Sequence, residues 1–118
     1  MIKCEFSKPK YELFVLFDLK IIPMTTCFTR EHVKILKNIG YSHIKVASYD
    51  CSSFSMLREL NQYFKKIILS TGASYDQEIL KAVNIIDKKK LSLLHCVTIY
   101  PTLKKQLHLS RIGFLKKL

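Results

Sequence analysis

The sequence predicts an α/β fold in which about four parallel strands alternate with helices, as in part of a (β/α) TIM barrel. Four short apolar runs carry this prediction, at residues 21–25, 43–47, 67–69 and 91–97. Each run is apolar enough to be covered on both faces, which is typical of parallel strands. A complete eight-stranded barrel needs about 250 residues, and the chain has 118. We therefore expect residues 1–118 to form a single partial barrel domain, although an open four-stranded sheet with helices on both faces fits the same pattern.

Helical segments with start and stop signals lie between the four strands. Gly40 follows the first apolar helical stripe and is typical of a helix stop. Ser74 has the spacing of a capping box with Gln77 and predicts the start of a later helix. Residues 11–20 show a helical pattern ahead of the first strand. These signals complete the strand–helix alternation.

The charge balance allows a second class of function. The chain has 20 Lys and Arg residues against 9 Asp and Glu residues, a net charge of +11. The lysines are spread along the chain, and only three of the basic residues are arginines, which are the usual readers of guanine. We therefore expect a solvated lysine surface and no nucleic-acid partner. A small basic α/β binding module for nucleic acid or a phosphorylated ligand is the alternative.

The cysteines and the apolar runs indicate a cytoplasmic protein. Cys4, Cys27, Cys51 and Cys96 lack the spacing of a zinc or redox motif, so we interpret them as reduced thiols. No apolar run approaches the 18 or more residues of a membrane span. Acidic residues interrupt the N-terminal apolar segment, which therefore does not resemble a signal peptide. We expect no membrane association.

Polar side chains inside and after the second strand are candidate ligand-binding groups. Lys45 lies within an apolar strand, where an unpaired ammonium is costly and an anionic partner is favoured. An edge strand that faces water would explain Lys45 equally well. Ser48 and Asp50 follow this strand, and Asp50 can polarise a substrate hydroxyl or simply occupy a turn.

The next two strands also end at polar residues. Ser70 precedes a threonine and Gly72, which would let the backbone approach a phosphate or carboxylate ahead of a helix. Thr98 and Tyr100 follow the fourth strand and can present hydroxyl groups at the same rim. His95 lies in a buried strand, where a hydrogen-bonded core histidine is the commoner role.

Three motifs together resemble the sialic acid synthase (N-acetylneuraminate synthase) family, which includes the legionaminate and pseudaminate synthases. They are KVASYD at 45–50, ILSTGA at 68–73 and LLHCVTIYPT at 93–102. The last two are specific in combination, and the likeness runs from about residue 21 to the C-terminus.

The resemblance implies a homodimeric TIM-barrel enzyme of sialic acid biosynthesis with an additional antifreeze-like domain. Such enzymes condense phosphoenolpyruvate with an N-acetylated sugar aldehyde such as N-acetylmannosamine, using divalent Mn or Mg, and release phosphate. Lys45, Ser48 and Ser70 match positions that hold phosphoenolpyruvate. Tyr100 matches a tyrosine that touches the substrates, and Thr98 stands where several relatives have asparagine.

Asp50 is the candidate catalytic residue because it stands where the family has a glutamate. The usual S-G-E motif is here Ser48-Tyr49-Asp50, so a bulky ring replaces glycine and the carboxylate is one methylene shorter. These two changes are expected to alter the sugar accepted or to weaken the site.

The resemblance also implies functional residues that fall outside this chain. The family's early glutamate and its lysine–aspartate pair would precede residue 1, and its metal-binding histidines would follow Leu118. None of the four histidines here matches a metal-ligand motif, so we expect no metal ligands in the chain. We therefore expect a fragment that is inactive alone. A second polypeptide that completes the barrel is the alternative.

Overall fold

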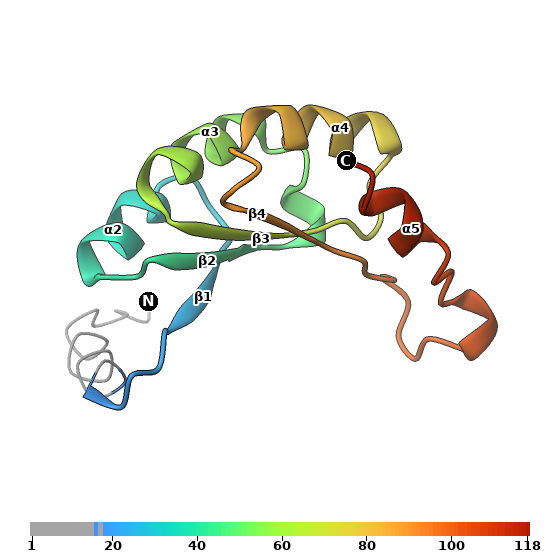
Figure 1. Cartoon of the computed structure of the whole chain (residues 1–118), viewed down its shortest axis with the longest axis horizontal. Coiled ribbons are helices and arrows are strands. Elements are labelled where there is room, and N and C mark those ends of the chain that lie inside the picture. Colours follow the sequence, from blue (N-terminus) through green and yellow to red (C-terminus); the bar gives the residue numbers. More distant parts are fainter. Residues whose placement is uncertain (1–15, 17) are drawn as a thin grey trace, which may run out of the picture.

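The sheet contains four parallel strands in the order of the sequence (Figure 1). The computed structural model describes residues 16 and 18–118, so residues 11–15 and 17 of the predicted helix at 11–20 lie outside the described residues. The strands are Met24–Cys27 (β1), His43–Val46 (β2), Lys66–Ser70 (β3) and Leu91–Leu94 (β4), and each pairs in parallel with the next. The predicted α/β class with four parallel strands is confirmed.

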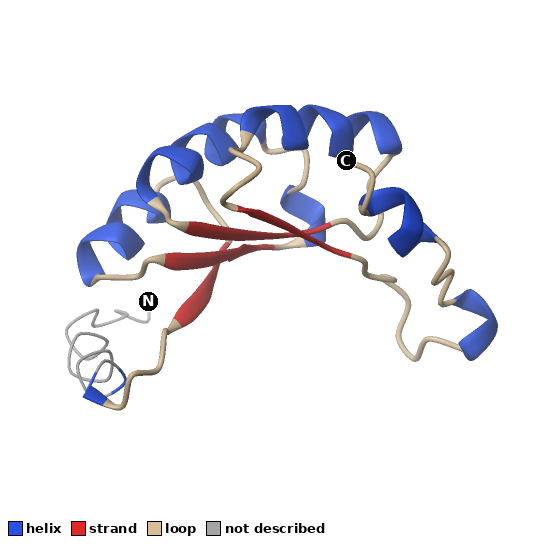
Figure 2. Cartoon of the chain, viewed as in Figure 1, coloured by secondary structure: helices blue, strands red, loops and turns tan. Residues whose placement is uncertain are grey.

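Three helices cover one face of this sheet. They are His32–Ile39 (α2), Phe54–Tyr63 (α3) and Asp76–Ile85 (α4), and each connects one strand to the next. Figure 2 shows all three on the same side of the sheet, as in a barrel wall. Because the alternative architecture places helices on both faces of the sheet, this arrangement contradicts it.

The remaining elements are short and lie around the carboxyl ends of the strands or after them. A 3₁₀ turn, Ser48–Asp50 (η1), follows β2, and a second one, Lys104–Gln106 (η2), precedes the C-terminal helix Arg111–Leu115 (α5). Within residues 16 and 18–118, no helix has the length and apolar character needed to cross a bilayer.

The core lies between the sheet and helices α2–α4. Alternate strand residues point toward the helices, and those of β2 and β3 are fully buried: Ile44, Val46, Ile67 and Leu69. They pack with buried apolar residues of the helices, which include Val33, Leu57, Leu60, Ile79 and Ala82. This outer face of the sheet therefore supplies most of the hydrophobic stabilisation.

The intervening strand residues form the opposite, inner face of the sheet. The strand register aligns Thr26, Lys45, Ile68 and Ser92 across all four strands. None of these four side chains is fully buried. The inner face is thus a mixed polar and apolar surface without a covering layer among the described residues (Figure 2).

The first and fourth strands are displaced or shorter than predicted. The first strand was predicted at 21–25, but pairing starts at Met24, after Pro23, which has no N–H to donate. The fourth was predicted to reach residue 97, but it ends at Leu94, which pairs with Ser70, the last residue of β3. Strand β4 therefore stops where its partner stops.

The sequence signals predicted the end of helix α2 correctly and the start of helix α4 one residue too early. Gly40 ends α2 with a φ of 120°, in the left-handed region that favours glycine, as predicted. The predicted capping pair of Ser74 and Gln77 is wrong by one residue. The backbone N–H of Tyr75 donates to the Glu78 carboxylate at 2.8 Å, while the Ser74 hydroxyl bonds elsewhere in the turn.

Candidate functional site

Lys45 and Ser70 share the inner face of two neighbouring strands. Lys45 of β2 is aligned with Ile68 of β3, and Ser70 follows Ile68 by two residues. Because side chains alternate along a strand, Ile68 and Ser70 point to the same side as Lys45. The structure therefore brings these two predicted site residues to one face.

The turns after β2 and β3 are locked together through Ser48. The backbone N–H of Gly72 donates to Ser48 Oγ at 3.1 Å. The Ser74 hydroxyl has two acceptors within reach, the Gly72 carbonyl oxygen at 3.2 Å and the Ser48 carbonyl oxygen at 3.4 Å. Since Ser48 Oγ accepts the Gly72 proton, its own hydroxyl proton stays available for a ligand. Ser48 is thus held in place as a hydrogen-bond donor.

Neighbouring protein atoms occupy the space that a side chain at Gly72 would need. A Cβ at this position would lie 2.9 Å from Thr98 Cγ2 and 3.0 Å from both the Cys96 carbonyl oxygen and Ser48 Oγ. The sequence suggested space for an approaching anion, whereas the structure fills that space with the turns that follow β2 and β4. Gly72 therefore holds three strand ends together, and Thr98 lies within this cluster.

Ser70 is a buried hydroxyl with unused hydrogen-bonding capacity. The residue is 1% exposed, and its Oγ has no hydrogen-bond partner among the described residues. Its neighbour Thr71 is satisfied, because the Thr71 hydroxyl and N–H both donate to the Leu94 carbonyl oxygen, at 3.1 and 3.0 Å. An unsatisfied buried hydroxyl costs about 1–3 kcal/mol, so a polar ligand atom that reached Ser70 would recover that energy.

Asp50 and Tyr100 lie apart from this cluster. Asp50 ends η1, accepts a 3.4 Å hydrogen bond from the Ser53 hydroxyl and lines a surface pocket with Arg30 and Arg58. Tyr100 is fully exposed. The structure therefore links Ser48 and Thr98 through Gly72 and places Lys45 and Ser70 on one sheet face, while none of the described contacts joins Asp50 or Tyr100 to these residues.

A pocket with a mixed polar and apolar lining opens beside the cluster, between the turn after β3 and helix α5. It has a volume of about 860 Å³, and Thr98 is the one predicted site residue in its lining. Arg111 of α5 forms an ion pair with Asp76 of α4 at 2.5 Å and stacks on Phe114, with 5.5 Å from the guanidinium to the ring centre. Sequence reasoning missed this pair because its members are 35 residues apart.

His95 is hydrogen-bonded as predicted, but it lies just after β4 and is partly buried, and not within a buried strand. Its Nε2 lies 2.7 Å from the carbonyl oxygen of Leu107 and ties the end of β4 to the segment before α5. Its Nδ1 is buried and has no partner within the described part of the chain. If Nε2 donates this bond, Nδ1 is left as an acceptor.

Metal ligands are not grouped in the described residues. Within residues 16 and 18–118, no cluster of three or more His, Cys, Asp or Glu side chains is arranged to hold an ion. These residues do not fit the divalent metal that the family resemblance implies, so we derive no chemical step through a metal.

The cysteines in the described part of the chain are free thiols. Cys27 and Cys51 are buried and Cys96 is partly buried, while Cys4 lies outside the described residues. Burial raises the pKa of Cys27 and of Cys51 above 9.0, and this desolvation outweighs the hydrogen bonds that lower it. Both buried thiols therefore pack as small neutral side chains.

The model of the NeuB family matches residues 5–118. The chain belongs to the NeuB family. Among curated relatives, it is similar to the N,N'-diacetyllegionaminic acid synthase of Campylobacter jejuni, with 33% identity over 98 residues. That alignment covers 79% of this chain and 29% of the synthase. The chain spans about 30% of the length of the curated relatives it matches.

Solved structures of synthases share the fold of this NeuB-family chain. The N-acetylneuraminic acid (sialic acid) synthetase from Leptospira borgpetersenii, solved in complex with citrate, superposes with a TM-score of 0.78 and 34% identity. The superposition covers 92% of this chain and 40% of that one. A truncated 3-deoxy-D-arabino-heptulosonate 7-phosphate synthase from Thermotoga maritima gives a TM-score of 0.74 at 15% identity, over 92% of this chain and 43% of that one, which shows the fold alone. These neighbours are TIM-barrel synthases, so the predicted partial barrel is confirmed.

Proposed function

We propose that this chain carries the phosphoenolpyruvate-binding part of a nonulosonic acid synthase. In this proposal Lys45 pairs with the ligand's negative charge, while Ser48 and Ser70 donate hydroxyl protons to its oxygens. The observation that carries the proposal is the buried Ser70 hydroxyl without a partner, on the same sheet face as the Lys45 ammonium.

The chemistry of these groups suits a small polyanion. Hydrogen bonds from an ammonium to phosphate or carboxylate oxygens are among the strongest in proteins. Ser48 is already oriented by Gly72, so less entropy is lost when it binds a ligand. Membership of the NeuB family supports phosphoenolpyruvate as that polyanion.

The acceptor in this proposal is an N-acetylated sugar aldehyde such as N-acetylmannosamine. Thr98 would contact it at the rim, because Thr98 lies beside Gly72 and lines the adjacent pocket. Asp50 remains the proposed catalytic group and Tyr100 a proposed substrate contact, although none of the described contacts joins either residue to Lys45 or Ser70. The described residues do not fit a divalent metal. We therefore propose that the chain binds phosphoenolpyruvate but does not condense it with a sugar.

Calorimetric titration with phosphoenolpyruvate tests the binding site. We expect Lys45→Met and Ser70→Ala each to weaken binding at least about tenfold, the loss of one charge-assisted hydrogen bond. Lys66→Met is the matched control, because Lys66 has the same charge and lies on the same sheet face at the other end of β3. An equal loss in Lys66→Met would show that binding follows general positive charge and would refute the site.

Two further assays test the rest of the proposal. When the chain is mixed with phosphoenolpyruvate, N-acetylmannosamine and manganese, no phosphate should be released. Measurable release would contradict the proposal that the chain by itself is inactive.

Binding of the chain to duplex DNA should be weak and depend little on salt. Tight binding with a steep salt dependence would instead favour the basic binding module.

A further inference from the structure

The segment after β4 packs on the turn after β3. The Leu94 carbonyl oxygen accepts hydrogen bonds from both the hydroxyl and the N–H of Thr71, at 3.1 and 3.0 Å. A Cβ at Gly72 would lie 3.0 Å from the Cys96 carbonyl oxygen and 2.9 Å from Thr98 Cγ2. These contacts join residues 94–98 to residues 71–72. The position of one segment therefore constrains the position of the other.

His95 lies within this segment and ties it to the chain ahead of α5. Its Nε2 lies 2.7 Å from the carbonyl oxygen of Leu107, 12 residues further along. Because a carbonyl oxygen only accepts hydrogen bonds, Nε2 carries the proton in this contact. In the neutral ring Nδ1 is then without a proton, and it is buried. The bond closes residues 95–107 into a loop and so limits the conformations that the segment can adopt.

The turn after β3 also directs the Ser48 hydroxyl. The Gly72 N–H donates to Ser48 Oγ at 3.1 Å, which leaves the hydroxyl proton of Ser48 for a ligand. A hydrogen bond weakens steeply when its donor is turned away from the acceptor. Ser48 is thus oriented only while the Gly72 peptide keeps its place, and residues 94–98 pack on that turn. A continuous series of contacts runs from His95 through Gly72 to Ser48.

We propose that His95 is a positioning residue that keeps the Ser48 hydroxyl directed at the ligand. Its bond to Leu107 sets the segment after β4, this segment holds Gly72, and Gly72 orients Ser48. The inference rests on the proposed function, because it takes Ser48 as a group that binds phosphoenolpyruvate. Since the contacts from His95 to Ser48 involve no ligand atom, they can be tested with and without ligand.

Two substitutions separate the hydrogen bond of His95 from the rest of its side chain. The amide nitrogen of glutamine extends about as far from the backbone as Nε2, so His95→Gln keeps a donor for Leu107. The amide nitrogen of asparagine takes the place of Nδ1, so His95→Asn loses the bond. In the wild-type chain, a long-range ¹H–¹⁵N spectrum should show a protonated Nε2 and an unprotonated Nδ1. A neutral ring protonated at Nδ1 would contradict the bond to Leu107.

Amide hydrogen exchange without ligand tests the link from His95 to Gly72. We expect the Gly72 amide to exchange about tenfold faster in His95→Asn and within about twofold of the wild-type rate in His95→Gln, because local opening governs its protection. The Ile67 amide is the reference, because it donates to the Lys90 carbonyl oxygen at 2.9 Å near the start of β3. Its rate should stay the same in both variants.

A double-mutant cycle measured by calorimetry tests the link to the ligand. His95→Asn should weaken the binding of phosphoenolpyruvate about fivefold, and it should have little further effect in the Ser48→Ala background, because contacting residues are not additive. His95→Gln should bind phosphoenolpyruvate as tightly as the wild-type chain does.

Three results would overturn the positioning role. Equal acceleration of Gly72 and Ile67 exchange in His95→Asn would show that His95 only stabilises the fold. A His95→Gln variant that behaves like His95→Asn would show that the hydrogen bond to Leu107 is not the cause. A binding loss in His95→Asn that persists in full in Ser48→Ala would show that His95 does not act through Ser48. If the wild-type chain binds no phosphoenolpyruvate while Gly72 exchange changes as expected, the proposed function fails and the control of Ser48 by His95 stands.

Discussion

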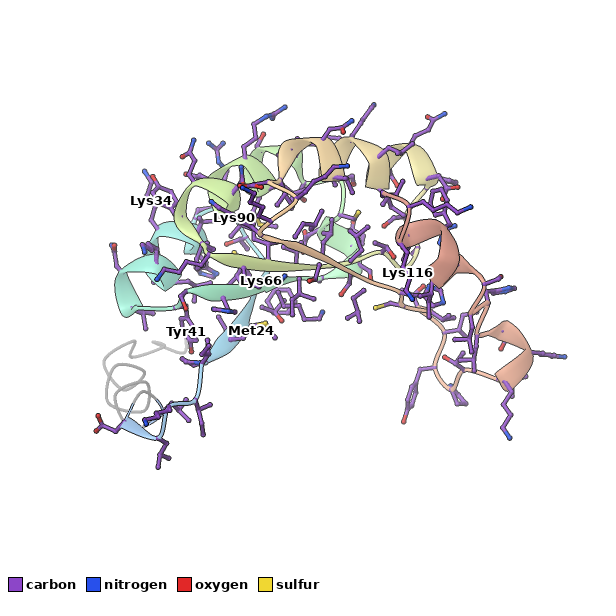
Figure 3. The ribbon with its side chains drawn as sticks, in the orientation of Figure 1. Met24, Lys34, Tyr41, Lys66, Lys90 and Lys116 are labelled. Atoms are coloured by element: carbon purple, nitrogen blue, oxygen red, sulfur yellow. The ribbon has the colours of Figure 1, made fainter. Side chains whose placement is uncertain are left out.

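The outer face of the sheet contributes to stability, whereas the inner face carries the candidate ligand-binding groups. On the outer face, the side chains of Ile67 and Leu69 are fully buried beneath the helices. On the inner face, Lys45 and Ile68 stay partly exposed, and the buried Ser70 keeps an unpaired hydroxyl. Hydrophobic burial on the outer face stabilises the fold, which leaves the inner face free to carry polar groups that are costly in a core. Figure 3 labels Lys34 on helix α2 and Met24 on strand β1.

The strongest test of this difference compares neighbouring residues of β3. Leu69→Ala removes a fully buried side chain, and we expect it to lower the free energy of unfolding by about 2–5 kcal/mol. Ile68→Ala removes a partly exposed one on the opposite face, and we expect a loss below about 1.5 kcal/mol. Urea denaturation at one fixed protein concentration measures both. Equal losses would mean that the inner face is as tightly packed as the outer.

The second test concerns how tightly the turns at the carboxyl ends of the strands pack against one another. Gly72→Ala pushes a methyl group against Thr98, Cys96 and Ser48, and we expect it to cost about 1–3 kcal/mol of stability. Gly113→Ala in α5 is the control, because no atom lies within 4 Å of its added Cβ. It should be neutral or stabilise by up to about 1 kcal/mol, the helix propensity difference. A neutral Gly72→Ala would show that the turns are loosely packed.

The smallest effect concerns thiol reactivity. Burial raises the pKa values of Cys27 and Cys51, so at pH 8 a smaller fraction of each is the reactive thiolate. Alkylation by iodoacetamide, followed by peptide mass spectrometry, should modify the partly exposed Cys96 before Cys27 and Cys51. The rates at Cys27 and Cys51 should rise as pH increases toward their raised pKa values. Faster modification of Cys27 than of Cys96 would contradict the burial of the outer face.

The alternation of strands and helices could be predicted because it depends on local signals. The apolar runs predicted the four strands in their correct order, and Gly40 predicted the end of helix α2. The strand ends could not be predicted as well, because pairing partners decide them. Leu94 ends β4 because Ser70 ends β3, and no local feature of residues 91–97 reveals that.

The candidate site could be predicted only in part. Lys45 and Ser70 were identified from polar residues in apolar strands, and parallel pairing explains why they share a face. The contacts of Gly72 with Ser48 and Thr98 depend on how three turns pack, which sequence spacing does not encode. The same limit applies to Arg111 and Asp76, which meet only in the folded chain.

The central claim is that the inner face at the carboxyl ends of β2 and β3 binds a small polyanion. Amide NMR shifts of the labelled chain, followed during titration with phosphoenolpyruvate, test it most directly. We predict saturable shifts that centre on Lys45, Ser48, Ser70 and Gly72 and that vanish in Ser70→Ala. Shifts centred on the surface lysines at 88–90 or 104–105, unchanged in Ser70→Ala, would contradict the claim.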